Sequence, residues 1–352
     1  MAGSIPSVQQ AAVLQNPGDG FSITLRKDIP VGDPGPKEVL VKLSCTGLCH
    51  SEVRAVLGWG SYNAIIGHEG VGTVVKYGPG VSSSLLGECV GVKWLYSACG
   101  GCSVCQRGFP QNCAKQLNTS RHVPGTLQQY VVADARFISR IPTGVPAEIA
   151  APLLCAGLTM AGALSHLEKE LQPGDWVVIS GSGGGLGHLG VQLAARVQEL
   201  RVIAVDSGES KRDLSLASGA EVFIDYQHED VPARVQEVTG EGAHATIVVP
   251  GTREAFHTAA LVVRNMGHLV TVGLPRNDIE LPISATICAA RGLTIKGSSV
   301  GTESQIESLL QLAVAGVIEP SISVFEFSET PRLIRGLTKD EVVGRAVVKL
   351  PE

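Results

Sequence analysis

Short apolar runs, broken by glycine and proline, make up the first 150 residues of the chain. Runs over 38–43, 72–77 and 130–133 have the length and the β-branched composition of strands. Clusters such as Asp33-Pro34-Gly35-Pro36 and Gly78-Pro79-Gly80 separate them and mark turns. The pattern predicts an irregular, β-rich domain.

From residue 157 onward the pattern changes to alternating strand-like and helix-like segments. A helical pattern over 158–167 precedes a buried-strand run at 176–179, and further strand candidates follow at 202–205, 222–224, 245–249, 269–272 and 293–295. This alternation predicts parallel βαβ units, and six strands suit a doubly wound sheet. The tail from about residue 299 is mixed again and ends in a strand pattern over 345–350.

Composition narrows the functional classes. With 352 residues, 44% of them hydrophobic and 17% charged, the chain can bury two cores. A net charge of -5 gives no electrostatic footprint for nucleic acid or an anionic membrane. The N-terminus lacks a signal-peptide pattern, and no segment approaches the roughly 20 apolar residues that cross a bilayer. We therefore expect a soluble protein of the reducing cytoplasm, where nine cysteines suit metal binding better than disulfides.

Four cysteines stand at short intervals in one stretch, namely Cys99, Cys102, Cys105 and Cys113. Four thiolates can close a tetrahedron around Zn²⁺ with no open position, which is the arrangement of a structural site. Disulfides or buried free thiols are the alternatives, but two-residue spacing strains pairing between neighbours. The spacing therefore predicts a structural zinc.

A glycine-rich turn follows the strand candidate at 176–179 and consists of Gly181, Ser182, Gly183, Gly184, Gly185, Leu186 and Gly187. Such a turn lets backbone N–H groups approach a pyrophosphate at a helix N-terminus, although a flexible surface loop has the same composition. Asp206 follows Gly187 by 19 residues, at the end of the next strand, where a carboxylate binds the adenosine ribose. A capping role is the alternative for Asp206. The pattern favours NAD, but Lys211 and Arg212 lie close enough to leave NADP open.

Several segments together resemble the zinc-containing medium-chain alcohol dehydrogenases, most closely the fungal, yeast-type branch. They are Gly47-Leu48-Cys49-His50-Ser51, Gly67-His68-Glu69-Gly70, Lys93-Trp94-Leu95, the four-cysteine stretch, 151–157, the glycine turn and 221–225. The resemblance spans essentially the whole chain and implies an α/β fold with a GroES-like, irregular β-rich catalytic domain over 1–156. It implies a Rossmann coenzyme domain with a doubly wound parallel sheet over 157–298, and a return to the catalytic domain over 299–352. A homodimer or homotetramer is also implied.

The resemblance assigns roles to individual residues. It implies that Cys49, His68 and Cys155 hold a catalytic zinc, with Glu69 as an alternate ligand, and that the four-cysteine stretch holds the second zinc. It implies that Ser51 hydrogen-bonds the substrate oxygen and that His50 faces the cofactor pyrophosphate. The remaining NAD contacts would come from Lys211, Val272, Gly273, Leu274, Ser298, Val300 and Arg345. Candidate walls of the substrate pocket are Trp59, Tyr62 and Trp94.

The chain also departs from the yeast-type pattern. Glu52 stands where that pattern has an aspartate supporting the zinc-bound histidine, and Arg54 replaces a relay histidine and cannot act as a base. The interval between Cys49 and His68 is a few residues shorter. We therefore expect hydride transfer between NAD(H) and a small-molecule alcohol, aldehyde or ketone that is larger than ethanol, as in fungal secondary metabolism. The alternatives are an ethanol-type enzyme, a non-catalytic NAD-binding member of the fold, and a zinc-free quinone reductase.

Overall fold

The chain forms two compact units, each with a hydrophobic core of its own. A computed structural model describes residues 4–275, 279–339 and 342–352. One unit comprises Met1–Cys155, Thr302–Val314 and Pro320–Glu352, and the other comprises Ala156–Gly301 and Ala315–Glu319. The core of the first unit gathers residues such as Val41 and Val348, and that of the second gathers residues such as Val178 and Ile203.

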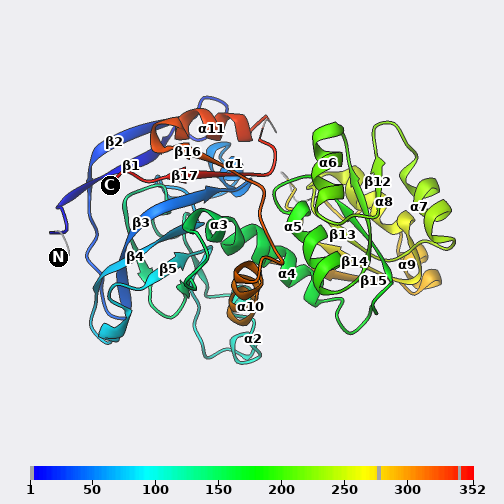
Figure 1. Ribbon diagram of the computed structural model, residues 1–352, viewed down its shortest axis with the longest axis horizontal. Coiled ribbons are helices and arrows are strands. Elements are labelled where there is room, and N and C mark those ends of the chain that lie inside the picture. The colour runs from blue at the N-terminus through cyan, green and yellow to red at the C-terminus, as the bar shows by residue number, and fades with distance from the viewer. Residues whose placement is uncertain (1–3, 276–278, 340–341) are drawn as a thin grey trace. The chain divides into compact units, whose positions relative to one another are not determined.

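A seven-stranded sheet forms the centre of the first unit (Figure 1). Its strands follow the order β16-β17-β3-β4-β5-β9, with β8 paired to β3, and only β16 and β17 run parallel. Their bounds are β3 (Glu38–Leu48), β4 (Gly70–Tyr77), β5 (Cys89–Val92), β8 (Tyr130–Asp134), β9 (Ser139–Arg140), β16 (Ile322–Glu326) and β17 (Arg345–Lys349). Two irregularities in its pairing with β4 let β3 run on past the expected 38–43 to Leu48, immediately before Cys49.

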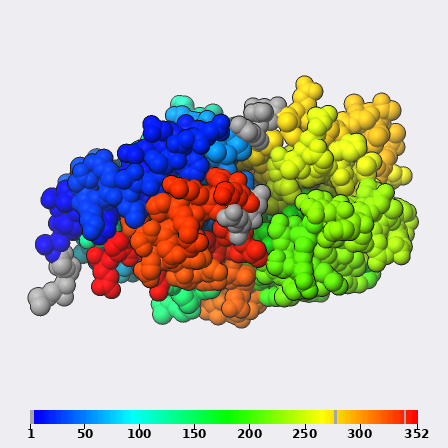
Figure 2. Space-filling model, turned by 90° about the horizontal axis from the view of Figure 1, so that it is seen from above, coloured from blue at the N-terminus to red at the C-terminus, as the bar shows by residue number. Residues whose placement is uncertain are grey.

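Smaller elements complete the first unit. The hairpin of β1 (Val8–Gln15) and β2 (Ser22–Pro30) was not expected, because β2 is mostly exposed and shows no clean alternation. A two-stranded sheet pairs β6 (Leu95–Ser97) with β7 (Leu117–Asn118). In Figure 2 the red and orange C-terminal residues lie against the blue N-terminal ones, in keeping with the pairing of β17 with β3. The helices are α1 (Ser51–Val56), α2 (Ser103–Gln106), α3 (Ala147–Pro152), α10 (Glu303–Val314) and α11 (Thr330–Leu337).

The second unit is a six-stranded, fully parallel sheet in the order β12-β11-β10-β13-β14-β15. The strands are β10 (Trp176–Ser180), β11 (Arg201–Asp206), β12 (Val222–Asp225), β13 (Ala243–Val248), β14 (Val263–Thr271) and β15 (Thr294–Gly297). The helices are α4 (Leu158–Ser165), α5 (Gly187–Gln192), α6 (Glu209–Ala217), α7 (Val231–Thr239), α8 (Arg253–Val262) and α9 (Ala285–Arg291). The order matches the Rossmann arrangement and confirms the expected α/β fold class.

One long helical stretch corrects an expectation from the sequence. Ala147–Ser165 is long and apolar enough to cross a membrane by length and composition, whereas the sequence analysis found no such segment. In the structure 78% of its apolar window is buried inside the protein, so it is an internal helix. It runs through α3, a π-helical turn at Leu153–Gly157, and α4. Pro152 lacks the N–H that a regular helix needs at this point, and the π turn that follows carries Cys155.

Candidate active site and metal centres

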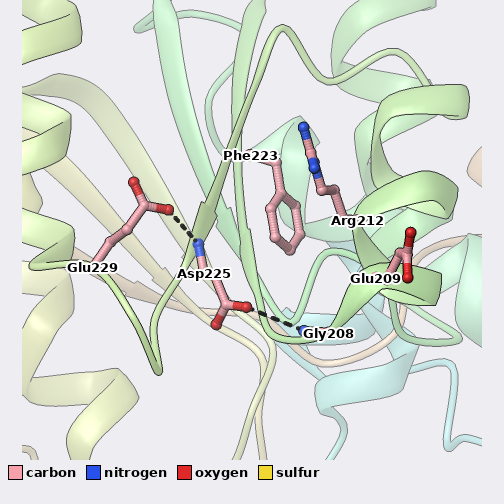
Figure 3. A pocket seen from close by; sticks show the side chains of 6 residues that line it. All are labelled: Gly208, Glu209, Arg212, Phe223, Asp225 and Glu229. Carbon is pink, nitrogen blue, oxygen red and sulfur yellow. Dashed lines mark hydrogen bonds between the residues drawn. The ribbon is translucent and has the colours of Figure 1, made fainter.

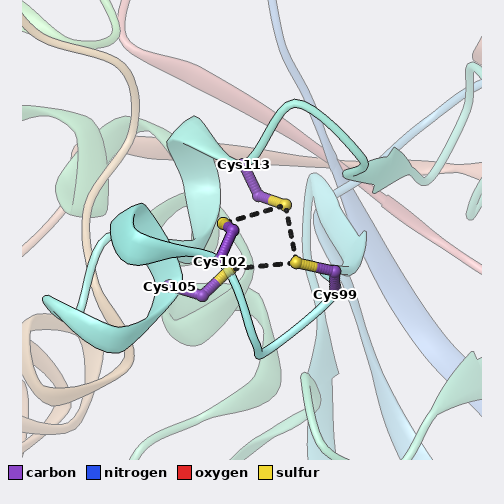
Figure 4. A group of neighbouring side chains, drawn as sticks. All are labelled: Cys99, Cys102, Cys105 and Cys113. Atoms are coloured by element: carbon purple, nitrogen blue, oxygen red, sulfur yellow. Dashed lines mark hydrogen bonds between the residues drawn. The ribbon is translucent and has the colours of Figure 1, made fainter.

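The four-cysteine stretch folds into a compact lobe in which the sulfur atoms converge (Figure 4). The Sγ atom of Cys113 lies 3.5 Å from that of Cys99 and 3.9 Å from that of Cys102, and those of Cys99 and Cys105 are 3.9 Å apart. A tetrahedral zinc with bonds of about 2.3 Å to sulfur needs edges of about 3.8 Å. The spacing of the four sulfurs therefore fits a closed zinc site.

Backbone N–H groups in this lobe lower the pKa of Cys99 and Cys113 and favour their thiolate forms, whereas burial raises the pKa of Cys105 to about 12. The N–H groups of Gly101 and Cys102 lower the pKa of Cys99 to about 6. The N–H of Lys115 donates to Cys113 Sγ over 3.3 Å. All nine cysteines of the chain are free thiols, so disulfides do not compete for these sulfurs. The four sulfurs therefore form a donor set that could hold a metal ion.

A second cluster consists of Cys49, His68, Glu69 and Cys155, all buried, with ligand atoms within 4.8 Å of one another. Cys49 follows β3, the His68-Glu69 pair precedes β4, and Cys155 lies on the π turn. The Sγ atoms of Cys49 and Cys155 are 3.9 Å apart, and His68 Nε2 lies 3.2 Å from Cys155 Sγ. Residues that the sequence places far apart thus converge on one point, with a donor set suited to zinc.

The carboxylate of Glu52 fixes two members of this cluster. One oxygen lies 2.9 Å from His68 Nδ1, and the other accepts a hydrogen bond of 2.6 Å from the backbone N–H of Cys49. An Nδ1–H that donates to Glu52 leaves the lone pair of His68 Nε2 on the side of Cys155, where a metal needs it. Glu52 sits in the first turn of α1 and is 1% exposed. The glutamate therefore serves where the yeast-type pattern has an aspartate.

Glu69 is held by a buried arginine. Arg345, at the start of β17, donates to both carboxylate oxygens over 2.5 Å. Burial raises the pKa of Glu69 to about 7, although the Arg345 guanidinium opposes this. A Cβ on Gly47 would lie 2.0 Å from a Glu69 oxygen, so only glycine leaves room for the carboxylate. The sequence did not indicate this pair, which is 276 residues apart and has no local signal. The resemblance assigns Arg345 to NAD, whereas here its guanidinium faces Glu69.

Other predicted active-site residues surround the second cluster. Ser51 Oγ lies 3.6 Å from Cys49 Sγ, and His50 is exposed at the N-cap of α1. The ring of Trp94 meets His68 edge-on, with centroids 5.3 Å apart, and Tyr62 lies 6.5 Å from Trp94. The structure thus places the Ser51 hydroxyl and the Trp94 ring beside candidate metal ligands, with Tyr62 on the far side of that contact, against Trp94.

The glycine-rich turn joins β10 to the N-terminus of α5, as the sequence predicted. Gly181 has a φ of 69°, and a Cβ on Gly187 would lie 2.0 Å from the Gly181 carbonyl oxygen. Glycine is therefore required at both positions. Asp206, at the end of β11, accepts a hydrogen bond of 3.0 Å from the N–H of Gly183, and Lys211 Nζ lies 3.1 Å from it.

The other candidate cofactor residues of the second unit also follow its strands. Val272, Gly273 and Leu274 come after β14, and Ser298 and Val300 come after β15. They share the carboxyl edge of the parallel sheet with the glycine turn and Asp206, the edge at which such sheets bind nucleotides. His50 and Arg345 belong to the first unit.

Comparison with known proteins agrees with this arrangement. The family model described as alcohol dehydrogenase GroES-like domain matches residues 35–143, and the one described as zinc-binding dehydrogenase matches residues 185–315. Alcohol dehydrogenase 2 of Emericella nidulans is 38% identical and the alcohol dehydrogenase of Schizosaccharomyces pombe 37% identical, each over 99% of both chains. The acetophenone reductase of Geotrichum candidum, solved with NAD, has a TM-score of 0.84 at 27% identity, covering 99% of this chain and 98% of its own. These matches confirm the resemblance, and the chain belongs to the zinc-containing medium-chain alcohol dehydrogenases.

Proposed function

We propose that the protein is an NAD-dependent dehydrogenase or carbonyl reductase whose catalysis requires the cluster of Cys49, His68 and Cys155. One observation carries this proposal. Glu69 completes the cluster, but its carboxylate is engaged by Arg345. Cys49, His68 and Cys155 would then hold the metal and leave its fourth position open, as in other catalytic zinc sites.

Zinc in this position supplies Lewis-acid polarisation of an alcohol or carbonyl oxygen, and NAD(H) exchanges the hydride. The chain itself orients the ligands through Glu52 and excludes water, since all four members of the cluster are buried. Ser51 has a hydroxyl that can hold the proton of the substrate oxygen. An arginine side chain has no acceptor for that proton, so Arg54 cannot relay it, and in our proposal the proton passes from Ser51 to solvent.

We propose a substrate larger than ethanol, such as an aromatic or otherwise bulky carbonyl compound of secondary metabolism. The support is the ring of Trp94 against His68, with Tyr62 packed near Trp94, because flat rings offer a large apolar contact area to a bulky substrate. The name of the Geotrichum relative, an acetophenone reductase, agrees with this class. Ethanol-type activity is the competing assignment.

The experiment combines a zinc count with a substrate panel. Zinc per subunit is measured for the wild type and for Cys49→Ala, and NADH oxidation is followed with aliphatic and aromatic aldehydes and ketones. We expect two zincs in the wild type, one in the variant, and loss of activity in the variant. Activity that survives Cys49→Ala would point to a zinc-independent reductase, and two zincs without activity would point to a non-catalytic member. Acetaldehyde as the best substrate by kcat/KM would refute the larger substrate.

We further propose a homodimer or homotetramer located in the cytoplasm. Met266, Leu281, Ile287 and Ile295 expose 70%, 43%, 37% and 37% of their surface on or near α9, β14 and β15. Among the described residues β15 pairs only with β14, so a second copy can cover this edge. Free thiols throughout the chain suit a reducing compartment. Light scattering tests this assembly by comparing the molar mass of the wild type in solution with that of Ile295→Asp.

A further inference from the structure

A small polar cavity lies beside the adenosine end of the proposed cofactor site (Figure 3). It has a volume of about 370 Å³ and is lined by Gly208, Glu209, Arg212, Phe223, Asp225 and Glu229. It adjoins Asp206, because Asp206 and Asp225 are partners in the pairing of β11 with β12. The 2'-phosphate that distinguishes NADP from NAD would have to be accommodated next to Asp206.

The N-terminus of α6 supplies the groups that usually bind such a phosphate. The helix begins at Glu209, and the free N–H groups of a first helical turn attract anions. In this chain the carboxylate of Asp225 already takes one of these N–H groups, that of the N-cap residue Gly208. It accepts a hydrogen bond of 3.3 Å from the N–H of Gly208, and a second of 3.0 Å from the N–H of Gln227, which follows β12 and lies outside α6. The Ser207 hydroxyl, followed by these N–H groups, lowers the pKa of Asp225 to about 2, so the carboxylate is ionised.

Acidic side chains outnumber cationic ones in the wall of this cavity. Lys211 is paired with Asp206 over 3.1 Å. The guanidinium of Arg212 points away from the Asp225 carboxylate in Figure 3, where Glu209 and Glu229 add two more acidic groups to the wall. His228 lies 3.2 Å from Asp225 but is mostly exposed to solvent.

We propose that Asp225 is a second specificity-determining residue for the cofactor, an internal anion that occupies the position a 2'-phosphate would need and so excludes NADP. The inference rests on the proposed NAD-dependent function and deepens it. Asp206 binds the ribose hydroxyls, and Asp225 fills the adjacent anion position. Removing Asp206 alone therefore leaves in place one of the two carboxylates that oppose a 2'-phosphate.

Binding of NADH and NADPH to the full-length protein tests this proposal. Dissociation constants are measured for the wild type, Asp225→Ser, Asp225→Asn, Asp206→Ser and the double variant Asp206→Ser/Asp225→Ser. The matched control is Glu229→Gln, which removes a charge from the same cavity but keeps an acceptor for the N–H of Asp225, 2.9 Å away. Thermal unfolding verifies that each variant is folded, and the two Asp225 variants guard against misfolding of either one.

We expect both Asp225 variants to bind NADPH on the order of tenfold more tightly, with NADH changed less than twofold, because a unit negative charge facing a phosphate is removed. The control should change NADPH binding less than threefold, and the double variant should gain more than Asp206→Ser alone. NADPH affinity that is unchanged in both Asp225 variants, or that changes in parallel with NADH, overturns the inference while leaving the proposed function intact. A wild type that binds neither nucleotide overturns both, and one that binds NADPH as tightly as NADH overturns the inference.

Discussion

Shortening Glu52 to aspartate should weaken the catalytic zinc site, even though aspartate is the residue of the yeast-type pattern. The two oxygens of Glu52 contact His68 Nδ1 at 2.9 Å and the Cys49 N–H at 2.6 Å, in a site that is 1% exposed. Aspartate is shorter by one carbon–carbon bond, about 1.5 Å. With the backbone of α1 fixed, its carboxylate can keep only one of the two contacts.

The magnitude follows from the contact that is lost. A hydrogen bond to a charged group contributes about 1.5–3 kcal/mol. That corresponds to roughly 10- to 150-fold in zinc affinity, in line with the roughly 10- to 100-fold found when groups that orient metal ligands are changed. Glu52→Ala loses both contacts and leaves a buried N–H of Cys49 without its partner, so its loss should be larger.

The assay is zinc retention in competition with a chelator, measured as zinc per subunit for the wild type, Glu52→Asp and Glu52→Ala. The exposed Glu168, changed to aspartate, is the matched control. We expect the variants to lose the catalytic zinc at a chelator concentration about 10- to 100-fold lower than the wild type needs. The zinc of the four-cysteine lobe should stay bound. Glu52→Asp that retains both zincs as firmly as the wild type would refute the idea that one carboxylate must hold both ligand residues.

Three further predictions concern the lobe, a buried lysine and a histidine. Cys105→Ser removes one of the four converging sulfurs, so the zinc content should fall by one ion per subunit. The site of Cys49 and its partners should keep its zinc. Elemental analysis that shows no loss of zinc would contradict this prediction. Lys93 is 4% exposed, and its Nζ lies 2.7 Å from a carboxylate oxygen of Glu303 and 2.9 Å from Ser139 Oγ. In a denaturant titration, Lys93→Met should lower the free energy of unfolding by about 1–3 kcal/mol. An unchanged midpoint would show that the pair does not stabilise the fold. Burial lowers the pKa of His268, against the opposing influence of Glu170, so the unfolded state binds protons first and stability should fall as the pH drops below about 6.5. The melting temperature of His268→Gln should fall less over that range than that of the wild type, and parallel curves would contradict the assignment.

Much of the architecture can be inferred from local sequence patterns. The six parallel strands were indicated by buried apolar runs such as 176–179 and 202–205, because a strand covered on both faces needs continuous apolar residues. The glycine turn before α5 was also visible, since a close approach such as that of Gly187 to Gly181 excludes other residues. Strand β2 was not visible, because its mostly exposed face carries no alternation.

The two candidate metal sites also differ in how far the sequence alone could predict them. The four cysteines of the lobe lie within one short stretch, so spacing alone predicted their convergence. For Cys49, His68 and Cys155 the residues gave only separate candidates, and family resemblance was needed to join them. Their meeting depends on the bulged β3 and on the π turn after Pro152, which no local pattern specifies.

The sequence by itself determined the composition of the site: which thiols, imidazoles, carboxylates and glycines the chain offers, and in which local turns they stand. Only the tertiary structure decided which of them meet. Arg345 turns to Glu69 across 276 residues, Glu52 reaches two ligand residues at once, and Asp225 takes the N–H of Gly208. Each of these contacts satisfies a charged or polar group that packing has brought to its partner, and packing is a property of the whole chain.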